Sequence, residues 1–407
     1  MPSRISRVTF PGSSGDELAA RLDLPAGPPK AYALFAHCFT CSKDLRAASR
    51  IAATLTDAGF AVLRFDFTGL GSSEGEFANT NFSSNVADLI AAADWLRSEH
   101  RAPQLIVGHS LGGAAAVVAG GQVDEVRAVA TIGAPSDTTH VSHLFDHALD
   151  TIESEGAAEV ELAGRRFTIT RQFLDDLRTG AVIEAARTLR KALLVMHSPV
   201  DNTVSVEHAA ALYEAARHPK SYVALDGADH LLGDHEDAGF AAGMIGTWAQ
   251  RFLDDESGVA PPPDATAQVV LAETTQGMFL NHVVVGHHRF LADEPESFGG
   301  FDAGPSPYDF LATALGACTS MTLRMYADRK QLPLDRVLVE VEHDKVHLDD
   351  AGRVDDSKPG RLDRFRRTIH LEGELADDQR ASLLRIADRC PVHRTLEQTS
   401  HITTELG

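Results

Sequence analysis

The sequence has few cysteines, no long hydrophobic run and no excess of positive charge. Four cysteines in 407 residues are too few for a disulfide framework. No run of about 18 uncharged apolar residues occurs, and the N-terminal MPSRISRVTFPG has no apolar core of signal-peptide length, so we expect a cytoplasmic protein. The 58 acidic residues against 37 basic ones give a net charge of −21, which repels phosphate backbones and anionic lipids. We therefore expect neither nucleic acid nor a membrane among the partners.

The length of the chain predicts two domains, because a single hydrophobic core stops growing near roughly 250 to 300 residues. The clearest boundary is DDESGVAPPPDATA, residues 254–267, where an acidic cluster meets three prolines. Proline lacks an amide donor and favours an extended chain, as in a linker. The pattern predicts one domain over 1–255, a linker over 256–267 and a second domain over 268–407.

The first domain shows an α/β pattern. Short runs that are apolar on both faces alternate with helix-length segments, as expected for a parallel sheet covered on both sides. ISRVTFP and ELAARLDLP look like an antiparallel pair leading into it, for about eight strands in total. Residues 136 to about 190 interrupt the alternation, and such a long excursion usually covers or shapes a binding site, so we expect a cap. The runs are AYALFAH, FAVLRFDF, PQLIVGHS, VRAVATIG, KALLVMHS and SYVALDG.

The second domain has an α+β pattern. Strand-like segments precede one long helix near 307–330, and further strands and a last helix near 376–390 follow. Ser306 as N-cap, Pro307 as first residue and Asp309 as the capping-box partner mark the start of the long helix. This helix is apolar enough to be buried. A cysteine within it, Cys318, is by default a small core residue.

The strongest motif is Gly108-His109-Ser110-Leu111-Gly112, a G-x-S-x-G that directly follows the strand-like QLIV and precedes the small-residue helix GGAAAVVAG. A sharp strand-to-helix turn needs small residues around the serine, and it holds the hydroxyl at the positive end of a helix. Ser110 is therefore the predicted nucleophile.

A serine hydroxyl needs a general base, and the base needs a carboxylate that fixes its tautomer. Asp201 follows the strand-like KALLVMH, and His230 follows the next strand-like run, which gives the chain order Ser, Asp, His. We predict Asp201 and His230 as the partners of Ser110. The alternatives nearby are Asp226 and Asp229 for the carboxylate, and His197 and His235 for the base.

Over roughly its first 250 residues the chain resembles the α/β-hydrolase superfamily, particularly its serine-aminopeptidase-like and carboxylesterase-like branch. The resemblance implies an oxyanion hole made by the amide of Leu111 and by an amide after His37 in HCFT, namely that of Phe39. It implies acyl transfer without cofactor or metal. A carboxylesterase for a small-molecule ester is the default, because no lipid-binding lid or peptide-terminus clamp is evident; peptidase and thioesterase activities stay open.

Cys38 and Cys41 form a C-x-x-C pair, which is compatible with a redox-active pair or with half of a zinc site. The chain has no second C-x-x-C pair to complete a zinc site. The favoured interpretation is two structural thiols that line the pocket.

Residues 293–330 and the segment IADRCPVHRTLE, residues 386–397, resemble the OsmC/Ohr family of peroxide reductases. The resemblance implies that Cys318 attacks an organic hydroperoxide and that Cys390 resolves the sulfenic acid as a disulfide, with a thiol reductant as partner. The thiolate needs a nearby cation. The family's first-strand arginine is absent from QVVLAETTQG, and Arg289 is a candidate substitute.

The same resemblance implies an intertwined homodimer formed through the C-terminal domain, with the thiol sites at the interface. The alternative for this domain is a non-catalytic dimerisation or thiol-sensing module, which the missing first-strand arginine supports.

Overall fold

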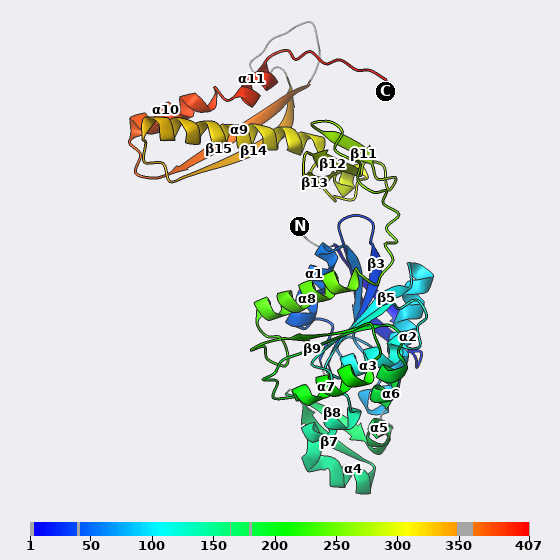
Figure 1. Cartoon of the computed structure of the whole chain (residues 1–407). Helices are drawn as coiled ribbons and strands as arrows, with labels where there is room; N and C mark the ends of the chain where they lie inside the picture. Colours follow the sequence, from blue (N-terminus) through cyan, green and yellow to red (C-terminus); the bar gives the residue numbers. More distant parts are fainter. Residues whose placement is uncertain (1–3, 39–40, 163, 179–180, 348–360, 407) are drawn as a thin grey trace. The chain divides into compact units, whose positions relative to one another are not determined.

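The computed structural model describes residues 4–38, 41–162, 164–178, 181–347 and 361–406 (Figure 1). It divides into two compact units, Met1–Val259 and Ala260–Gly407.

The first unit is built on one eight-stranded sheet in the order β1-β2-β4-β3-β5-β6-β9-β10. β1 and β2 form an antiparallel hairpin that pairs antiparallel with β4, and all the other pairings are parallel. The predicted mostly parallel sheet of about eight strands is therefore confirmed. The strands are β1 (Arg4–Pro11), β2 (Glu17–Leu24), β3 (Ala31–Ala36), β4 (Phe60–Phe65), β5 (Pro103–His109), β6 (Ala128–Ile132), β9 (Ala192–His197) and β10 (Lys220–Ala224).

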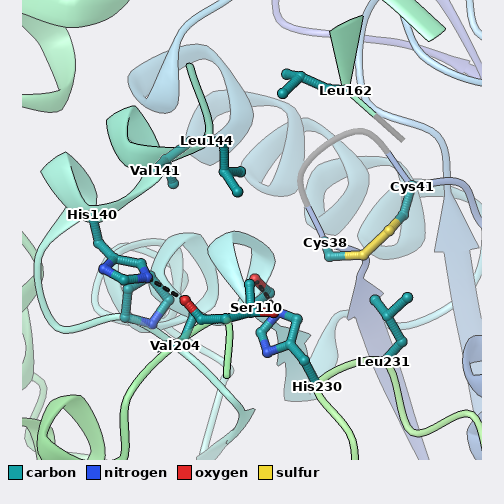
Figure 2. Close-up of a pocket in the computed structure, with 12 residues that line it drawn as sticks. Cys38, Cys41, Ser110, His140, Val141, Leu144, Leu162, Val204, His230 and Leu231 are labelled. Atoms are coloured by element: carbon teal, nitrogen blue, oxygen red, sulfur yellow. Dashed lines mark hydrogen bonds between the residues drawn. A yellow bond between two sulfur atoms is a disulfide. The ribbon is translucent and has the colours of Figure 1, made fainter. Parts of the chain in front are cut away.

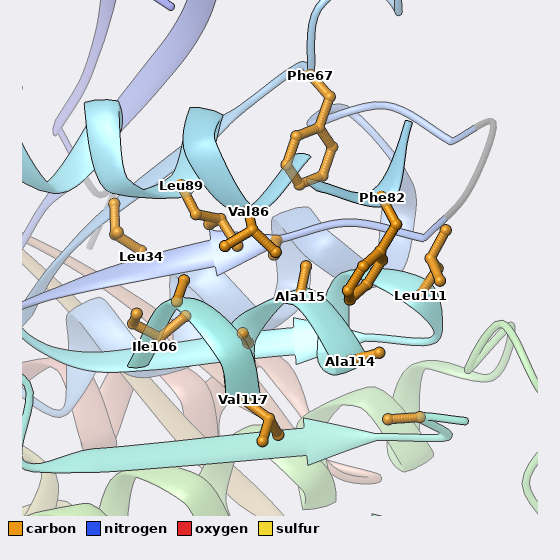
Figure 3. Packing of buried hydrophobic residues seen from close by; sticks show 14 of the residues in the cluster. Leu34, Phe67, Phe82, Val86, Leu89, Ile106, Leu111, Ala114, Ala115 and Val117 are labelled. Carbon is orange, nitrogen blue, oxygen red and sulfur yellow. The ribbon is translucent and has the colours of Figure 1, made fainter. Parts of the chain in front are cut away.

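Helices cover both faces of this sheet, which is why every residue of the central strands β3 to β6 and β9 is buried. On one face α1 (Arg46–Asp57) and α8 (His235–Ala249) lie side by side (Figure 1). On the other face lie α2 (Phe82–Glu99), α3 (Leu111–Gly120) and α7 (Val206–Ala215). Figure 3 shows Val86 and Leu89 of α2 packing with Ala115 of α3 near Ile106 of β5. This packing fixes the start of α3 relative to the sheet.

The segment between β6 and β9 forms the excursion expected from the sequence. Its hairpin, β7 with β8, is antiparallel, and its helices pack their apolar side chains into the same core as α2 and α3. The elements are η2 (Thr138–Ala148), α4 (Leu149–Glu155), β7 (Ala157–Leu162), β8 (Arg165–Thr170), α5 (Arg171–Leu177) and α6 (Ala181–Thr188).

The second unit has the predicted α+β arrangement. A three-stranded antiparallel sheet, β11-β12-β13, precedes a long helix, α9 (Pro307–Lys330), that packs on β14 of an antiparallel two-stranded sheet. The other elements are β11 (Val270–Glu273), β12 (Asn281–Val285), β13 (His288–Ala292), η3 (Glu296–Phe298), β14 (Arg336–His347), β15 (Arg361–Glu372), α10 (Asp377–Ala387) and α11 (Pro391–Glu397).

Helix α9 begins with the predicted capping box. The Ser306 hydroxyl accepts a hydrogen bond from the Asp309 amide at 3.3 Å, and the Asp309 carboxylate accepts one from the Ser306 amide at 2.9 Å. In the single chain only Leu315, Thr319, Leu323 and Ala327 of this helix are buried, so one chain alone does not bury it as expected. These residues form one stripe at helical spacing.

None of the helices in the described part of the chain combines the length and the apolar character that crossing a membrane requires.

Candidate active site

Ser110 stands alone between the end of β5 and the start of α3, with φ 54° and ψ −127°. A side chain in this left-handed region is strained, so the surroundings must hold it there. A Cβ on Gly108 would lie 2.3 Å from the carbonyl oxygen of Gly112, and a Cβ on Gly112 would lie 2.3 Å from the carbonyl oxygen of His37. Gly108 is therefore required for the turn to close, and Gly112 for the turn to pack against the end of β3.

The structure brings together the three side chains predicted from the sequence. The Ser110 hydroxyl lies 3.0 Å from Nε2 of His230, and Nδ1 of His230 lies 2.7 Å from Oδ2 of Asp201. With the proton on Nδ1, His230 donates to Asp201 and accepts the hydroxyl proton of Ser110. This hydrogen-bonded chain is the arrangement that makes a serine hydroxyl nucleophilic.

Asp201 is held as an acceptor by the turn that contains it. Its Oδ1 accepts hydrogen bonds from the amides of Thr203, at 2.8 Å, and Val204, at 2.9 Å. Burial raises the pKa of Asp201, but the hydrogen bonds from His230 and these two amides outweigh burial, and the net pKa is lowered. The carboxylate is therefore ionised at neutral pH and stabilises a positive charge on His230.

Three of the four alternative partners have other contacts. Oδ1 of Asp229 accepts from the Leu231 amide at 2.8 Å and so closes the turn after His230. His197 is buried and its Nε2 is bonded to the carbonyl of Val204 at 2.8 Å. His235 is exposed and contacts its neighbour Asp234. None of these contacts involves Ser110.

His109, which the sequence analysis did not single out as functional, holds the main chain of His230 in place. Its Nε2 donates to the main-chain carbonyl of His230 at 2.6 Å, and the two rings are 5.1 Å apart. Burial, followed by the charge of His230, lowers the pKa of His109 to about 4. His109 is thus neutral at pH 7. Its place inside the G-x-S-x-G motif was the only available signal.

A cavity of about 240 Å³ opens onto Ser110 and His230 (Figure 2). Its wall is mostly apolar and comes partly from the segment between β6 and β9, through Val141 and Leu144 of η2 and Leu162 of β7. The expected cap segment therefore shapes the pocket. Of the described residues that line the cavity, none is Asp, Glu, Lys or Arg.

Cys38 and Cys41 also line this cavity, and they are joined to each other by a disulfide (Figure 2). The expected place in the pocket wall is thus observed, but the interpretation as two thiols is wrong. The spacing fits a disulfide or two free thiols equally well, and only the facing side chains distinguish them. No cluster of three or more His, Cys, Asp or Glu suited to a metal ion occurs in the part of the chain that the structure describes.

The predicted oxyanion donors are only partly described. Leu111 is the first residue of α3, where the main-chain amides have no partner within the helix and form the positive end of its dipole. Phe39 lies outside the described residues, so its role stays a prediction.

A buried ion pair, missed by the sequence analysis, anchors the chain just after the disulfide. Nζ of Lys43 lies 2.6 Å from Oδ2 of Asp66, and the amide of Lys43 donates to Oδ1 of the same carboxylate at 2.6 Å. Both side chains are nearly inaccessible. A buried charge must be paired, so this contact holds the Lys43 segment against the end of β4.

In the second unit Cys318 and Cys390 are both free. Cys390 is fully buried at the start of α11, and its sulfur accepts a hydrogen bond from the His393 amide at 3.2 Å and lies 3.8 Å from the Thr319 hydroxyl oxygen. Thr319 follows the half-buried Cys318 on α9. The fold therefore brings Cys390 next to the turn of helix that carries Cys318.

Arg367 of β15, which the sequence analysis did not find, is a cation that contacts this turn of α9. Its guanidinium donates to the Thr319 hydroxyl at 2.7 Å, and to Asp388 at 2.8 Å. Arg289, the candidate substitute, instead donates to the carbonyl of Pro263 at 3.4 Å. The contact of Arg367 with α9 could not be predicted, because it depends on how β15 packs and nothing in the local sequence distinguishes Arg367 from the neighbouring arginines.

Comparison with known proteins matches a different family to each unit. Residues 27–145 match the model of the serine aminopeptidase S33 family, and residues 300–405 match the OsmC-like protein family. The human protein ABHD12B is 28% identical over 185 residues, which cover 44% of this chain and 48% of that protein. The chain thus matches about half the length of this curated relative.

Solved structures match the first unit. The esterase domain of a Rhodothermus marinus protein is 52% identical with a TM-score of 0.52, and the match covers 61% of this chain and 99% of that domain. Est1E from Butyrivibrio proteoclasticus, solved with ferulic acid bound, is 20% identical with a TM-score of 0.50, covering 60% and 99%. Mouse alpha/beta hydrolase domain-containing protein 10 is 20% identical with a TM-score of 0.51, also covering 60% and 99%. The last two likenesses are of fold alone.

Proposed function

Since this chain joins an α/β-hydrolase domain of the esterase kind to an OsmC-like domain, we propose that its first unit is a serine carboxylesterase for small acyl esters. The observation that carries the proposal is the chain of hydrogen bonds from Ser110 through His230 to Asp201, at 3.0 and 2.7 Å, at the base of an apolar cavity. The 52% identical esterase domain supports it.

In the proposed reaction Oγ of Ser110 attacks the ester carbonyl while Nε2 of His230 takes the hydroxyl proton. The Leu111 amide, and by prediction that of Phe39, donates to the oxyanion. His230 then returns the proton to the departing alcohol. Water, deprotonated by the same nitrogen, hydrolyses the acyl-enzyme, and Asp201 stabilises the imidazolium in both halves.

The lining of the cavity favours an ester over a peptide substrate. An aminopeptidase must neutralise the ammonium group of its substrate when it is removed from water, and a carboxylate is the usual partner. None of the described lining residues is acidic. The apolar wall and a volume of about 240 Å³ suit a short acyl chain.

The test is hydrolysis of p-nitrophenyl esters from acetyl to lauroyl by the full chain and by Ser110→Ala. We expect the short esters to react best, and the substitution to lower kcat by about 10⁴-fold or more. An aminoacyl p-nitroanilide and an acyl thioester measure the two alternatives, peptidase and thioesterase. The proposal fails if Ser110→Ala matches the wild type, or if a fluorophosphonate does not label Ser110.

For the second unit we propose a thiol peroxidase. Cys318 as thiolate attacks an organic hydroperoxide, releasing the alcohol and forming a sulfenic acid, with which Cys390 condenses to a disulfide and water. The contact of Cys390 with Thr319, and that of Arg367 with the same hydroxyl, support this proposal. A thiol reductant restores both thiols.

Peptide mapping after one equivalent of tert-butyl hydroperoxide tests the second activity. We expect a Cys318–Cys390 disulfide in the wild type and no peroxide consumption by Cys318→Ser. If neither disulfide nor consumption is found, the second unit is the alternative, a non-catalytic dimerisation or sensing module.

A further inference from the structure

The Cys38–Cys41 disulfide lies in the wall of the cavity that contains Ser110 and His230 (Figure 2). Cys38 follows His37 at the end of β3 and is 4% exposed, whereas Cys41 is only half-buried. Cys41 is thus the more accessible residue of the pair, and both residues border the cavity.

The chain around the disulfide has other anchors. The ring of His37 is bonded through Nδ1 to the Cys38 carbonyl at 2.8 Å, and the Cys41 amide donates to the same carbonyl at 3.1 Å. On the far side Lys43 is paired with the buried Asp66. A loop this short also gains little from cross-linking, because the stabilisation grows with loop length. None of these contacts depends on the bond between the two sulfurs, so the bond can open while they persist.

From its place in the pocket wall and from these independent anchors, we propose that Cys38–Cys41 is a redox-active site that small dithiols reduce through the acyl pocket. The site takes compounds of the size of the cavity's acyl occupant, and acyl group and dithiol exclude each other.

The exchange proceeds by two displacements. A thiolate of the dithiol attacks Sγ of Cys41, the bond to Sγ of Cys38 breaks, and Cys38 leaves as a thiolate. The second thiol of the reagent then attacks the mixed disulfide, releases Cys41 as a thiolate and closes the reagent's own disulfide. Two electrons pass to the protein, and the reagent's two protons go to the new thiolates or to water. An organic hydroperoxide reverses the change through a sulfenic acid, yielding an alcohol and water.

One consequence rests on the proposed esterase function. The disulfide forms part of the wall beside the nucleophile, so its opening changes the shape of the acyl site. We expect dithiol treatment to lower kcat/KM for the best ester several-fold, since catalysis depends on positioned reactants. The variant Cys38→Ser/Cys41→Ser is expected to lose this response.

The direct test counts thiols and needs no esterase activity. The native full chain is treated with dithiothreitol and alkylated, and peptide mass spectrometry reports alkylation of Cys38 and Cys41 over time. We expect reduction under native conditions. Filling the cavity, by a short alkyl phosphonate on Ser110 or by Leu144→Trp, is expected to slow it about tenfold or more, since exchange requires access to the sulfur.

Each of these two ways of filling the cavity has its own control. The phosphonate must not protect Ser110→Ala, which it cannot modify. Ile5→Trp changes an aliphatic side chain of nearly equal exposure, 46% against 47% for Leu144, outside the cavity lining, and should leave the rate unchanged.

The proposal is overturned if Cys38 and Cys41 are alkylated only after denaturation, which would make the bond purely structural. It is equally overturned if both cavity-filling arms leave the rate of reduction unchanged. A failure of the phosphonate to label the wild type would instead sink the esterase proposal, while the Leu144→Trp arm would still decide the redox site.

Discussion

In the proposed mechanism Asp201 fixes the tautomer of His230, through the bond of 2.7 Å between Nδ1 and Oδ2. In Asp201→Asn the amide nitrogen can face Nδ1, which then becomes the acceptor and leaves the proton on Nε2, where Ser110 needs a base. We expect kcat for the best ester to fall about 10³- to 10⁴-fold with little change in fold. Steady-state kinetics and circular dichroism measure the two effects, and a loss under tenfold would contradict the role assigned to Asp201.

His109 makes the stability of the first unit depend on pH. Its pKa is about 4 in the folded chain against 6.5 ordinarily, so between these values the unfolded chain binds the extra proton. The contribution of neutral His109 to folding is complete above pH 6.5 and is lost as the pH falls toward 4, by up to about 1.4 kcal/mol per pH unit.

His109→Phe removes this titration while keeping a ring. The difference in unfolding free energy between wild type and variant should therefore shrink as the pH falls from 6.5 to 4. Both tryptophans of the chain, Trp95 and Trp248, belong to the first unit, so urea titrations followed by their fluorescence report its unfolding. A difference that stays constant with pH would refute this prediction.

At the scale of the elements, the first turn of α3 packs directly on the end of β3. A Cβ on Gly112 would meet the carbonyl oxygens of His37 at 2.3 Å and Ala36 at 2.5 Å, and backbone atoms cannot move aside cheaply. We expect Gly112→Ala to destabilise the first unit by about 3 kcal/mol or more.

The matched control is Gly239→Ala on α8, where an added Cβ meets nothing within 4 Å. Alanine is the better helix former, so this variant should be neutral or more stable by up to about 1 kcal/mol. Thermal unfolding followed by tryptophan fluorescence compares the two. Equal melting temperatures would show that the β3–α3 contact is not as tight as described.

The elements of the first unit could be predicted because burial on both faces makes each central strand a continuous apolar run. The chain order of Ser110, Asp201 and His230 could likewise be predicted, since Ser110 and Asp201 follow two of those runs and His230 follows the edge strand β10. Contacts that depend on tertiary packing could not. His109 is hydrogen-bonded to the carbonyl of a residue 121 positions later in the chain. Arg367 of β15 donates to the hydroxyl of Thr319 on α9. The spacing of Cys38 and Cys41 is the same for thiols and for a disulfide.

At the scale of the whole molecule, the second unit exposes large apolar side chains one turn apart on α9, and an exposed apolar patch often marks an interaction site. Met321 and Met325 of α9 are 66% and 72% exposed. The resemblance to OsmC proteins implies that a second copy covers such a face, and we expect the full chain to be a homodimer through residues 260–407.

The pair of substitutions Met321→Lys and Met325→Lys places two charges on that face and should yield a monomer, because burying an unpaired charge is costly. Phe240→Lys, on the exposed side of α8 in the first unit, is the control and should leave the assembly unchanged. Sedimentation velocity measures the mass in solution. A double variant that still sediments as a dimer would exclude α9 from the interface.

The segment between β6 and β9 is inserted between two strands that pair directly with each other. Ser110, His230 and Asp201 all lie outside it, whereas Val141, Leu144 and Leu162 of the pocket wall lie within it. If the proposed function holds, the reacting groups and a large part of the pocket wall are thus encoded in separate stretches of the chain. During evolution, or in directed recombination, residues 138–188 can be exchanged or re-lengthened to change which ester is accepted, while the reacting groups keep their places.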